Sequence, residues 1–226
     1  MRRSLGVITL SALSLSAPFS LQLRPNFSPA HQIFALFGAA KKLPTGWVLH
    51  KQSQDLDKID LKVAEKPCAN WAWVAGIVAL AQVQGARMDQ QYLVDRLYGG
   101  SVCVRSAGDM GDLAQRISRD YVLADGQSFR LTAHFTPGAP SQADPLILSI
   151  RQGVPLMVVW RDHAYVLTGL DYDEYVAPTG NKIFIITELR LFDPAAEGEK
   201  SVAKFVRERD NPDDLTGILD LTINPK

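Results

Sequence analysis

The spacing of hydrophobic residues divides the chain into a helical first part and a strand-rich second part. In the stretch KPCANWAWVAGIVALAQVQG, residues 66–85, apolar side chains occupy nearly every position after Asn70. Asn70 belongs to the residue types that cap helices, and Gly85 to those that end them. The pattern predicts a central helix from Trp71 to about Gln84, buried on nearly every face.

Three shorter helices are predicted to follow. Asp89 precedes QQYLVDRLY, and Asp109 precedes MGDLAQRISRDY, whose apolar residues recur on one face. Pro145 stands at the first helical position ahead of LILSIRQ, and Gly153 closes that segment.

After Gly153 the hydrophobic pattern changes to that of strands. The segments VPLMVVW, HAYVLTGLDY, KIFIITELRLFD and GILDLTIN are rich in β-branched residues and leucine, and EYVAPTGN forms the loop of a long hairpin. One edge strand is expected between residues 41 and 66. Helices first and sheet second predict an α+β fold with a helical lobe at about 66–153 and a β lobe at about 154–226.

Residues 1–40 differ from the rest of the chain. MRRSLGVITLSALSLSAP has a basic start, an uncharged apolar run and then small residues before Pro18. This layout is typical of a secretory signal peptide and is too short for a membrane span. A disordered leader or a misassigned start is the alternative. We therefore expect a mature domain at 41–226 that is secreted or periplasmic, with no membrane attachment after leader removal.

Charge and composition exclude several function classes. Lysine plus arginine and aspartate plus glutamate number 24 each, so no net positive field attracts nucleic acid. The two cysteines and the separate histidines His31, His50 and His134 do not have the spacing of a zinc site. The sequence predicts no metal and no cofactor.

Three places have the chemistry of a cysteine-nucleophile site: the start of the buried helix, His163 at the head of a strand, and Asp193 at the end of the next strand. A helix N-terminus favours a thiolate, because its free N–H groups and dipole stabilise negative charge. A histidine then transfers the proton, and a carboxylate orients that histidine. The helix, His163 and Asp193 follow one another in this order.

NWAWVAGIVALAQVQG, HAYVLTGLDYD and LFDP together resemble the papain-like cysteine peptidases, in particular the bacterial group related to bacteriocin-leader-processing peptidases. The resemblance covers about residues 60–220. It implies that His163 is the general base, that Asp193 is the orienting acid, and that Ala72 occupies the position of the nucleophile. Alanine has no nucleophilic atom.

The resemblance also places an oxyanion-stabilising glutamine about six residues before the nucleophile. Here that neighbourhood holds Glu65 and Lys66. A carboxylate would repel an oxyanion, whereas a lysine has protons to donate. Gln52 and Gln54 are too far away in sequence to replace the glutamine.

Cys68 lies four residues before Ala72 and outside the first turn of the helix. In papain-like enzymes an extra cysteine just upstream of the nucleophile often forms a disulfide with a cysteine a few tens of residues later, a pattern that Cys103 fits. The alternatives are two free buried thiols, or a Cys68 that itself serves as the nucleophile.

The sequence therefore predicts a papain-like pseudoprotease that binds a peptide or protein segment in the cleft between its lobes. The alternatives are an active cysteine peptidase that uses Cys68, or an engineered Cys-to-Ala form of an active peptidase at position 72. Whether the chain is an enzyme depends on which of these holds. The sequence gives no indication of its oligomeric state.

Overall fold

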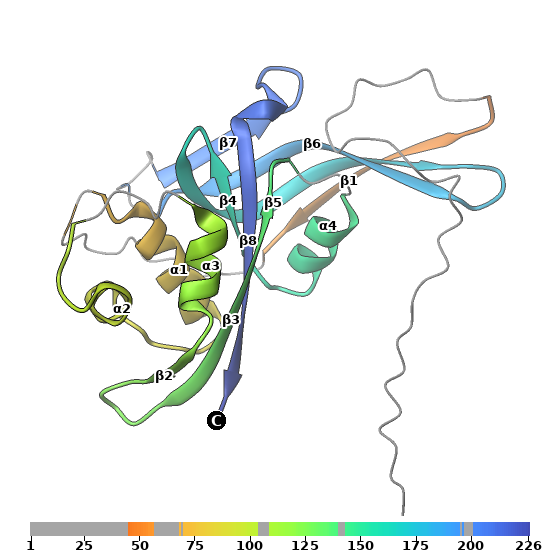
Figure 1. The fold of residues 1–226 in the computed structure, drawn as a ribbon. Helices are drawn as coiled ribbons and strands as arrows, with labels where there is room; N and C mark the ends of the chain where they lie inside the picture. The colour runs from red at the N-terminus through yellow and green to blue at the C-terminus, as the bar shows by residue number, and fades with distance from the viewer. Residues whose placement is uncertain are drawn as a thin grey trace, which may run out of the picture. The chain divides into compact units, whose positions relative to one another are not determined.

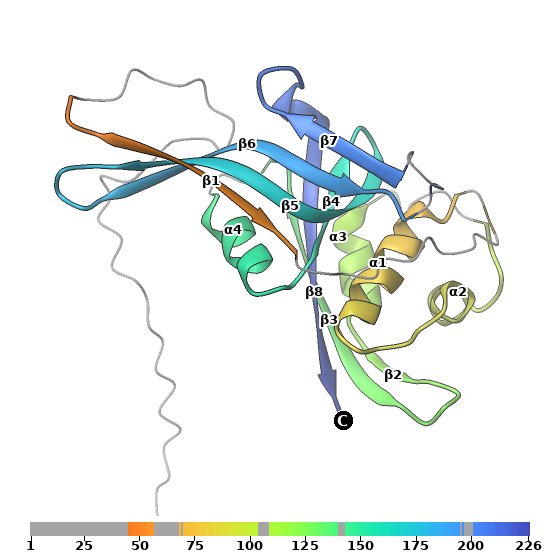
Figure 2. The same ribbon diagram turned by 180° about the vertical axis from the view of Figure 1, so that it is seen from behind.

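A single antiparallel sheet connects most of the described residues (Figure 1, Figure 2). The structure is a computed structural model and describes residues 45–56, 68, 70–103, 109–139, 143–194, 196 and 201–226. The elements, in chain order, are β1 (Val48–Asp55), α1 (Ala72–Val83), α2 (Gln90–Tyr98), α3 (Met110–Ile117), β2 (Asp120–Val122), β3 (Ser128–Pro137), α4 (Asp144–Arg151), β4 (Leu156–Trp160), β5 (His163–Val176), β6 (Lys182–Phe192), β7 (Val202–Val206), the 3₁₀ helix η3 (Pro212–Asp214) and β8 (Leu215–Pro225).

The strand order across the sheet is β2-β3-β8-β4-β5-β6-β7, and β1 pairs with β5 outside this path. The long strand β5 explains the branch, because its first part pairs with β4 and its second part, from Gly169 to Val176, pairs with β1. β3 pairs with β8 along its length. One sheet therefore runs through both of the residue ranges that the sequence assigned to separate lobes.

Helices cover both faces of this sheet. Helices α1, α2 and α3 share one hydrophobic cluster with β2 and β3, while α4 packs into a second cluster (Figure 1). The alternation of β4 separates the two clusters, since Met157 belongs to the first, and Leu156 and Val158 belong to the second. The fold class is α+β, as the sequence predicts.

The buried central helix is confirmed, and its residues from Trp73 to Ala81 are all buried. The predicted cap is wrong. The N-cap residue is Trp71, and its side chain makes no capping hydrogen bond. The side-chain amide of Asn70, the predicted cap, lies 3.7 Å from Cys103 Sγ instead. Tertiary contacts hold the start of α1 in place of a local capping bond.

The shorter helices are confirmed with their capping residues. The Asp89 carboxylate accepts a hydrogen bond from the Tyr92 N–H, and the Asp109 carboxylate accepts hydrogen bonds from the N–H groups of Gly111 and Asp112. Helix α4 has its proline in the first turn. The strands expected after Gly153 correspond to β4, β5, β6 and β8, while β2, β3 and β7 were not predicted.

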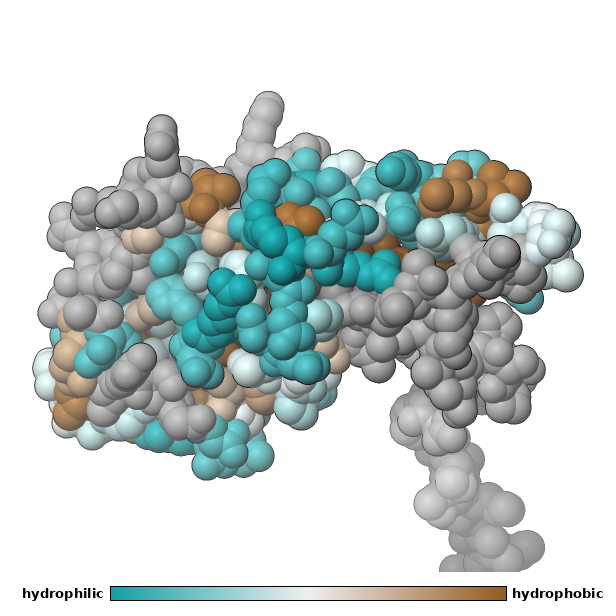
Figure 3. All heavy atoms as spheres, turned by 90° about the horizontal axis from the view of Figure 1, so that it is seen from above, coloured by the Kyte–Doolittle hydropathy of each residue, from teal (hydrophilic) through white to brown (hydrophobic). Residues whose placement is uncertain are grey.

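The surface seen from above is mainly hydrophilic near its middle, and its hydrophobic areas are small and separate (Figure 3). None of the helices in the described residues is long and apolar enough to cross a membrane. The predicted leader at 1–40 lies outside the described residues.

Candidate functional site

His163 and Asp193 lie in contact at one edge of the sheet. His163 is the first residue of β5, and Asp193 directly follows β6. Because β5 and β6 are antiparallel neighbours, the start of one meets the end of the other. His163 Nε2 lies 2.9 Å from Asp193 Oδ2, and the two side chains are 36% and 14% exposed. Nε2 is buried and has no hydrogen bond of acceptable geometry among the described residues, so the two side chains form an ion pair only when the imidazole is protonated.

The carboxylate next to Nε2 favours the tautomer that carries its proton on this nitrogen. The other ring nitrogen, Nδ1, is then the proton acceptor of the neutral imidazole. In this tautomer the imidazole can accept a proton at Nδ1, with the Asp193 carboxylate on the other side of the ring.

Tyr165 is the aromatic neighbour of this pair. Its ring centroid lies 4.7 Å from that of His163. Burial and the charge of Asp193 raise the pKa of Tyr165, and the charge of Arg161 opposes them. Tyr165 was not among the predicted site residues, although its position two residues after His163 on a strand predicts the same side of the sheet.

Ala72 is the first residue of α1 and the only residue from Trp71 to Ala81 that is not buried. A Cβ at Gly76, one turn later on the same face, would lie 4.0 Å from Pro194 Cγ. Since side chains four residues apart on a helix are separated by about 5–6 Å, the Ala72 methyl group lies no more than about 10 Å from Pro194 Cγ. The start of α1 is therefore close to the segment that carries Asp193.

The alternation along β5 determines the side of the sheet on which the imidazole lies. Ala164 and Val166 pack in the cluster that contains α1, whereas Tyr165 packs against the other cluster. His163 alternates with Ala164 and contacts the Tyr165 ring, so it leaves the sheet on the side of Tyr165, at the end of the strand. The structure brings His163 and Asp193 together, whereas α1, which begins with Ala72, packs against the other face of the sheet.

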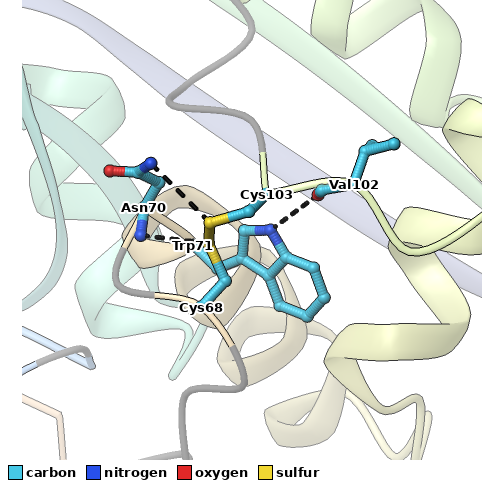
Figure 4. The surroundings of a disulfide bond; sticks show 5 residues. All are labelled: Cys68, Asn70, Trp71, Val102 and Cys103. Atoms are coloured by element: carbon cyan, nitrogen blue, oxygen red, sulfur yellow. Dashed lines mark hydrogen bonds between the residues drawn. A yellow bond between two sulfur atoms is a disulfide. The ribbon is translucent and has the colours of Figure 1, made fainter.

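Cys68 and Cys103 form a disulfide (Figure 4). Their Cα atoms are 5.8 Å apart, Cys68 is buried and Cys103 is exposed. The Trp71 Nε1–H donates a hydrogen bond to the Val102 carbonyl at 3.1 Å, so the same two segments meet twice. In this oxidised state Cys68 cannot serve as the nucleophile, because its sulfur is bonded to that of Cys103 and no free thiol remains.

Of the residues considered for the oxyanion position, the two that the structure describes, Gln52 and Gln54, lie away from His163. Glu65 and Lys66 lie outside the described residues. Gln52 and Gln54 lie on β1, where Gln54 is opposite Leu170. Leu170 is seven residues along β5 from His163, which corresponds to roughly 20 Å.

The structure adds no metal centre to this picture. In the described part of the chain, no three His, Cys, Asp or Glu side chains are grouped to hold a metal ion. His50 on β1 and His134 on β3 are exposed and lie on different strands, and His31 lies outside the described residues.

Comparisons with known proteins give no family assignment. No family model matches the chain, and no curated protein matches it. Among solved structures, UfSP from C. elegans is similar with 13% sequence identity and a TM-score of 0.33. The match covers 81% of this chain and 35% of that chain, so this chain spans about a third of the length of UfSP.

Proposed function

We propose that this chain is a papain-like protein without cysteine-peptidase activity, which binds a peptide segment at the surface around His163. The observation that carries the proposal is the 2.9 Å approach of His163 Nε2 to Asp193 Oδ2. Such a pair is the proton-transfer half of a cysteine-peptidase site. Support for the other half comes from Ala72, the partly exposed first residue of a helix that packs against Pro194.

The inactivity follows from the side chain at position 72. A methyl group cannot attack a carbonyl carbon, and loss of the nucleophile from a catalytic triad costs on the order of 10⁶-fold in turnover. The imidazole, the acid and the positive end of the helix remain to bind a peptide carbonyl or carboxylate. We also propose that the protein is exported, since its disulfide is compatible with an oxidising compartment.

The test is the variant Ala72→Cys. Both natural cysteines are bonded to each other, so the introduced thiol is the only one available for alkylation. A helix N-terminus and a nearby imidazolium should lower the pKa of this thiol from about 8.5 to between about 3.5 and 7.5. The rate of alkylation by iodoacetamide, measured from pH 4 to 10, gives this pKa, and peptide mapping confirms that the natural disulfide is intact.

Two controls identify the cause of a lowered thiol pKa. Ala72→Cys combined with His163→Ala should move the thiol pKa back towards its ordinary value. Val122→Cys places a thiol on an exposed position of β2 and should show an unshifted pKa. A thiol at position 72 that titrates like the one at position 122 would refute the proposed site.

Peptide cleavage and peptide binding separate the remaining alternatives. Full peptidase activity in Ala72→Cys is the result expected if the alanine had been engineered into an active enzyme. An acidic thiol without cleavage would indicate that the oxyanion side is also lost, as the presence of Glu65 suggests. Titration of the unchanged protein with peptide libraries, followed by NMR, should perturb His163, and unchanged His163 resonances would remove the peptide-binding function.

A further inference from the structure

The turn that precedes His163 holds Arg161 in a backbone conformation that arginine disfavours. Trp160 on β4 pairs with His163 on β5, so Arg161 and Asp162 form a two-residue connection. Both have positive φ angles, of 51° and 59°. Two-residue hairpins of this type normally use glycine or asparagine, because a larger side chain is strained in the left-handed region. Other contacts must hold this turn in place.

Arg161 makes those contacts. Its backbone N–H donates a hydrogen bond to the Asp214 carbonyl at 2.9 Å, and its Nε lies 2.9 Å from Asp214 Oδ2. Its Nη2 lies 3.4 Å from Asp210 Oδ1, and its guanidinium stacks 4.7 Å from the Trp160 ring centroid. The Asp210 side chain is only 7% exposed and also accepts a hydrogen bond from the Val206 N–H. The turn is thereby fastened to the segment around η3.

The Arg161 contacts act where β5 is not paired with β6, so the sheet itself does not fix the position of His163 relative to Asp193. The pairing of β5 with β6 begins only at Val166, which is opposite Phe192. Residues 163–165 therefore pair only with β4, and they form a hairpin tip beyond the last rung of the β5–β6 ladder. The position of the imidazole relative to Asp193 depends on how this tip is oriented.

We propose that Arg161 is a positioning residue, whose ion pairs with Asp210 and Asp214 orient the hairpin tip so that the His163 imidazole stays against Asp193. The proposal rests on the proposed function for the use of that imidazole. The contact itself can be measured without any assumption about function. Strain at a turn next to a reactive group is a common feature of functional sites.

The first test is NMR spectroscopy of the His163 ring in the full chain. Arg161→Gly removes the ion pairs but suits the left-handed turn, and Asp214→Asn removes one charge and keeps the shape of the side chain. In both variants we expect the His163 ring resonances to move towards those of Asp193→Asn. Arg130→Gln removes an exposed ion pair to Asp120 on β2 and is the matched control, which should leave the His163 signals unchanged.

The second test combines Arg161→Gly with Ala72→Cys. The alkylation rate of the introduced thiol at pH 6 should fall about tenfold relative to Ala72→Cys alone, because the thiolate loses its imidazolium partner. If Ala72→Cys shows no acidic thiol while the NMR changes occur, the proposed function fails and the positioning role stands. If Arg161→Gly and Asp214→Asn are folded and keep the His163 resonances of the unchanged protein, the positioning role is refuted. If Arg161→Gly does not fold, Asp214→Asn alone decides.

Discussion

Removal of the disulfide should cost this protein a large share of its stability. Cys68 and Cys103 are separated by 35 residues in sequence. For a closed loop of this length, the chain-entropy relation gives about 3.8 kcal/mol at 25 °C. A single domain of this size has an unfolding free energy of about 5–15 kcal/mol. The cross-link would thus supply a quarter or more of the total.

The assay compares three forms by urea unfolding, followed by tryptophan fluorescence. They are the oxidised protein, the same protein reduced with dithiothreitol, and the double variant Cys68→Ala with Cys103→Ser. Alanine suits the buried position 68 and serine suits the exposed position 103. We expect both disulfide-free forms to lose about 3–4 kcal/mol and the melting temperature to fall by about 8–15 °C.

Agreement between the reduced protein and the double variant is the internal control, since the two differ in side chains but share the missing cross-link. A loss below about 1 kcal/mol in both forms would refute the entropic argument. It would mean that residual structure keeps the two cysteine segments close together in the unfolded chain even without the disulfide.

Two further predictions concern the sheet and a helix cap. Arg190→Gln should lower the unfolding free energy by about 2 kcal/mol at pH 7, because Arg190 is 19% exposed and its guanidinium lies 2.7 Å from Asp171. Burial raises the pKa of Asp171, but hydrogen bonds from Ser53 and Arg190 and the charge of Arg190 lower it overall. The stabilisation is therefore present above the ordinary carboxyl range and lost as the pH falls below it, so urea unfolding at pH 3 should show a smaller difference; a difference independent of pH would contradict this. Asp109→Ala should cost about 1 kcal/mol and Asp109→Asn much less, since only the latter keeps an acceptor for the helix N–H groups; equal losses in thermal unfolding would exclude the cap.

The sequence predicted those elements whose hydrophobic pattern is strong and local. Helix α1 is apolar on every face, and β4, β5, β6 and β8 contain dense runs of β-branched residues and leucine. Strand β3 was missed although it carries a period-two signal, in which Phe129 and Leu131 are buried and Arg130 and Thr132 are exposed. Strand β7 is five residues long and lies at the edge of the sheet, where side-chain burial imposes little pattern.

The candidate site was predictable only in its residue types. His163 and Asp193 stand out because each is a polar residue at the end of an apolar strand. Their contact depends on the register of the β5–β6 hairpin, which a single sequence does not specify. The residues that hold Arg161 lie about 50 positions later in the chain. No local pattern links them to the turn.

The strained turn at Arg161 offers a reason why His163 and Asp193 stay in contact in a chain that has alanine at position 72. Folding alone does not require arginine at position 161, because glycine would adopt the same positive φ without strain. Arginine at this position supplies ion pairs to a buried carboxylate and to the end of η3, and these contacts orient the strand that begins with His163. A strained conformation persists when the surrounding contacts over-determine it. With Arg161 in the proposed positioning role, the contact of His163 with Asp193 depends on these ion pairs and not on the side chain at position 72.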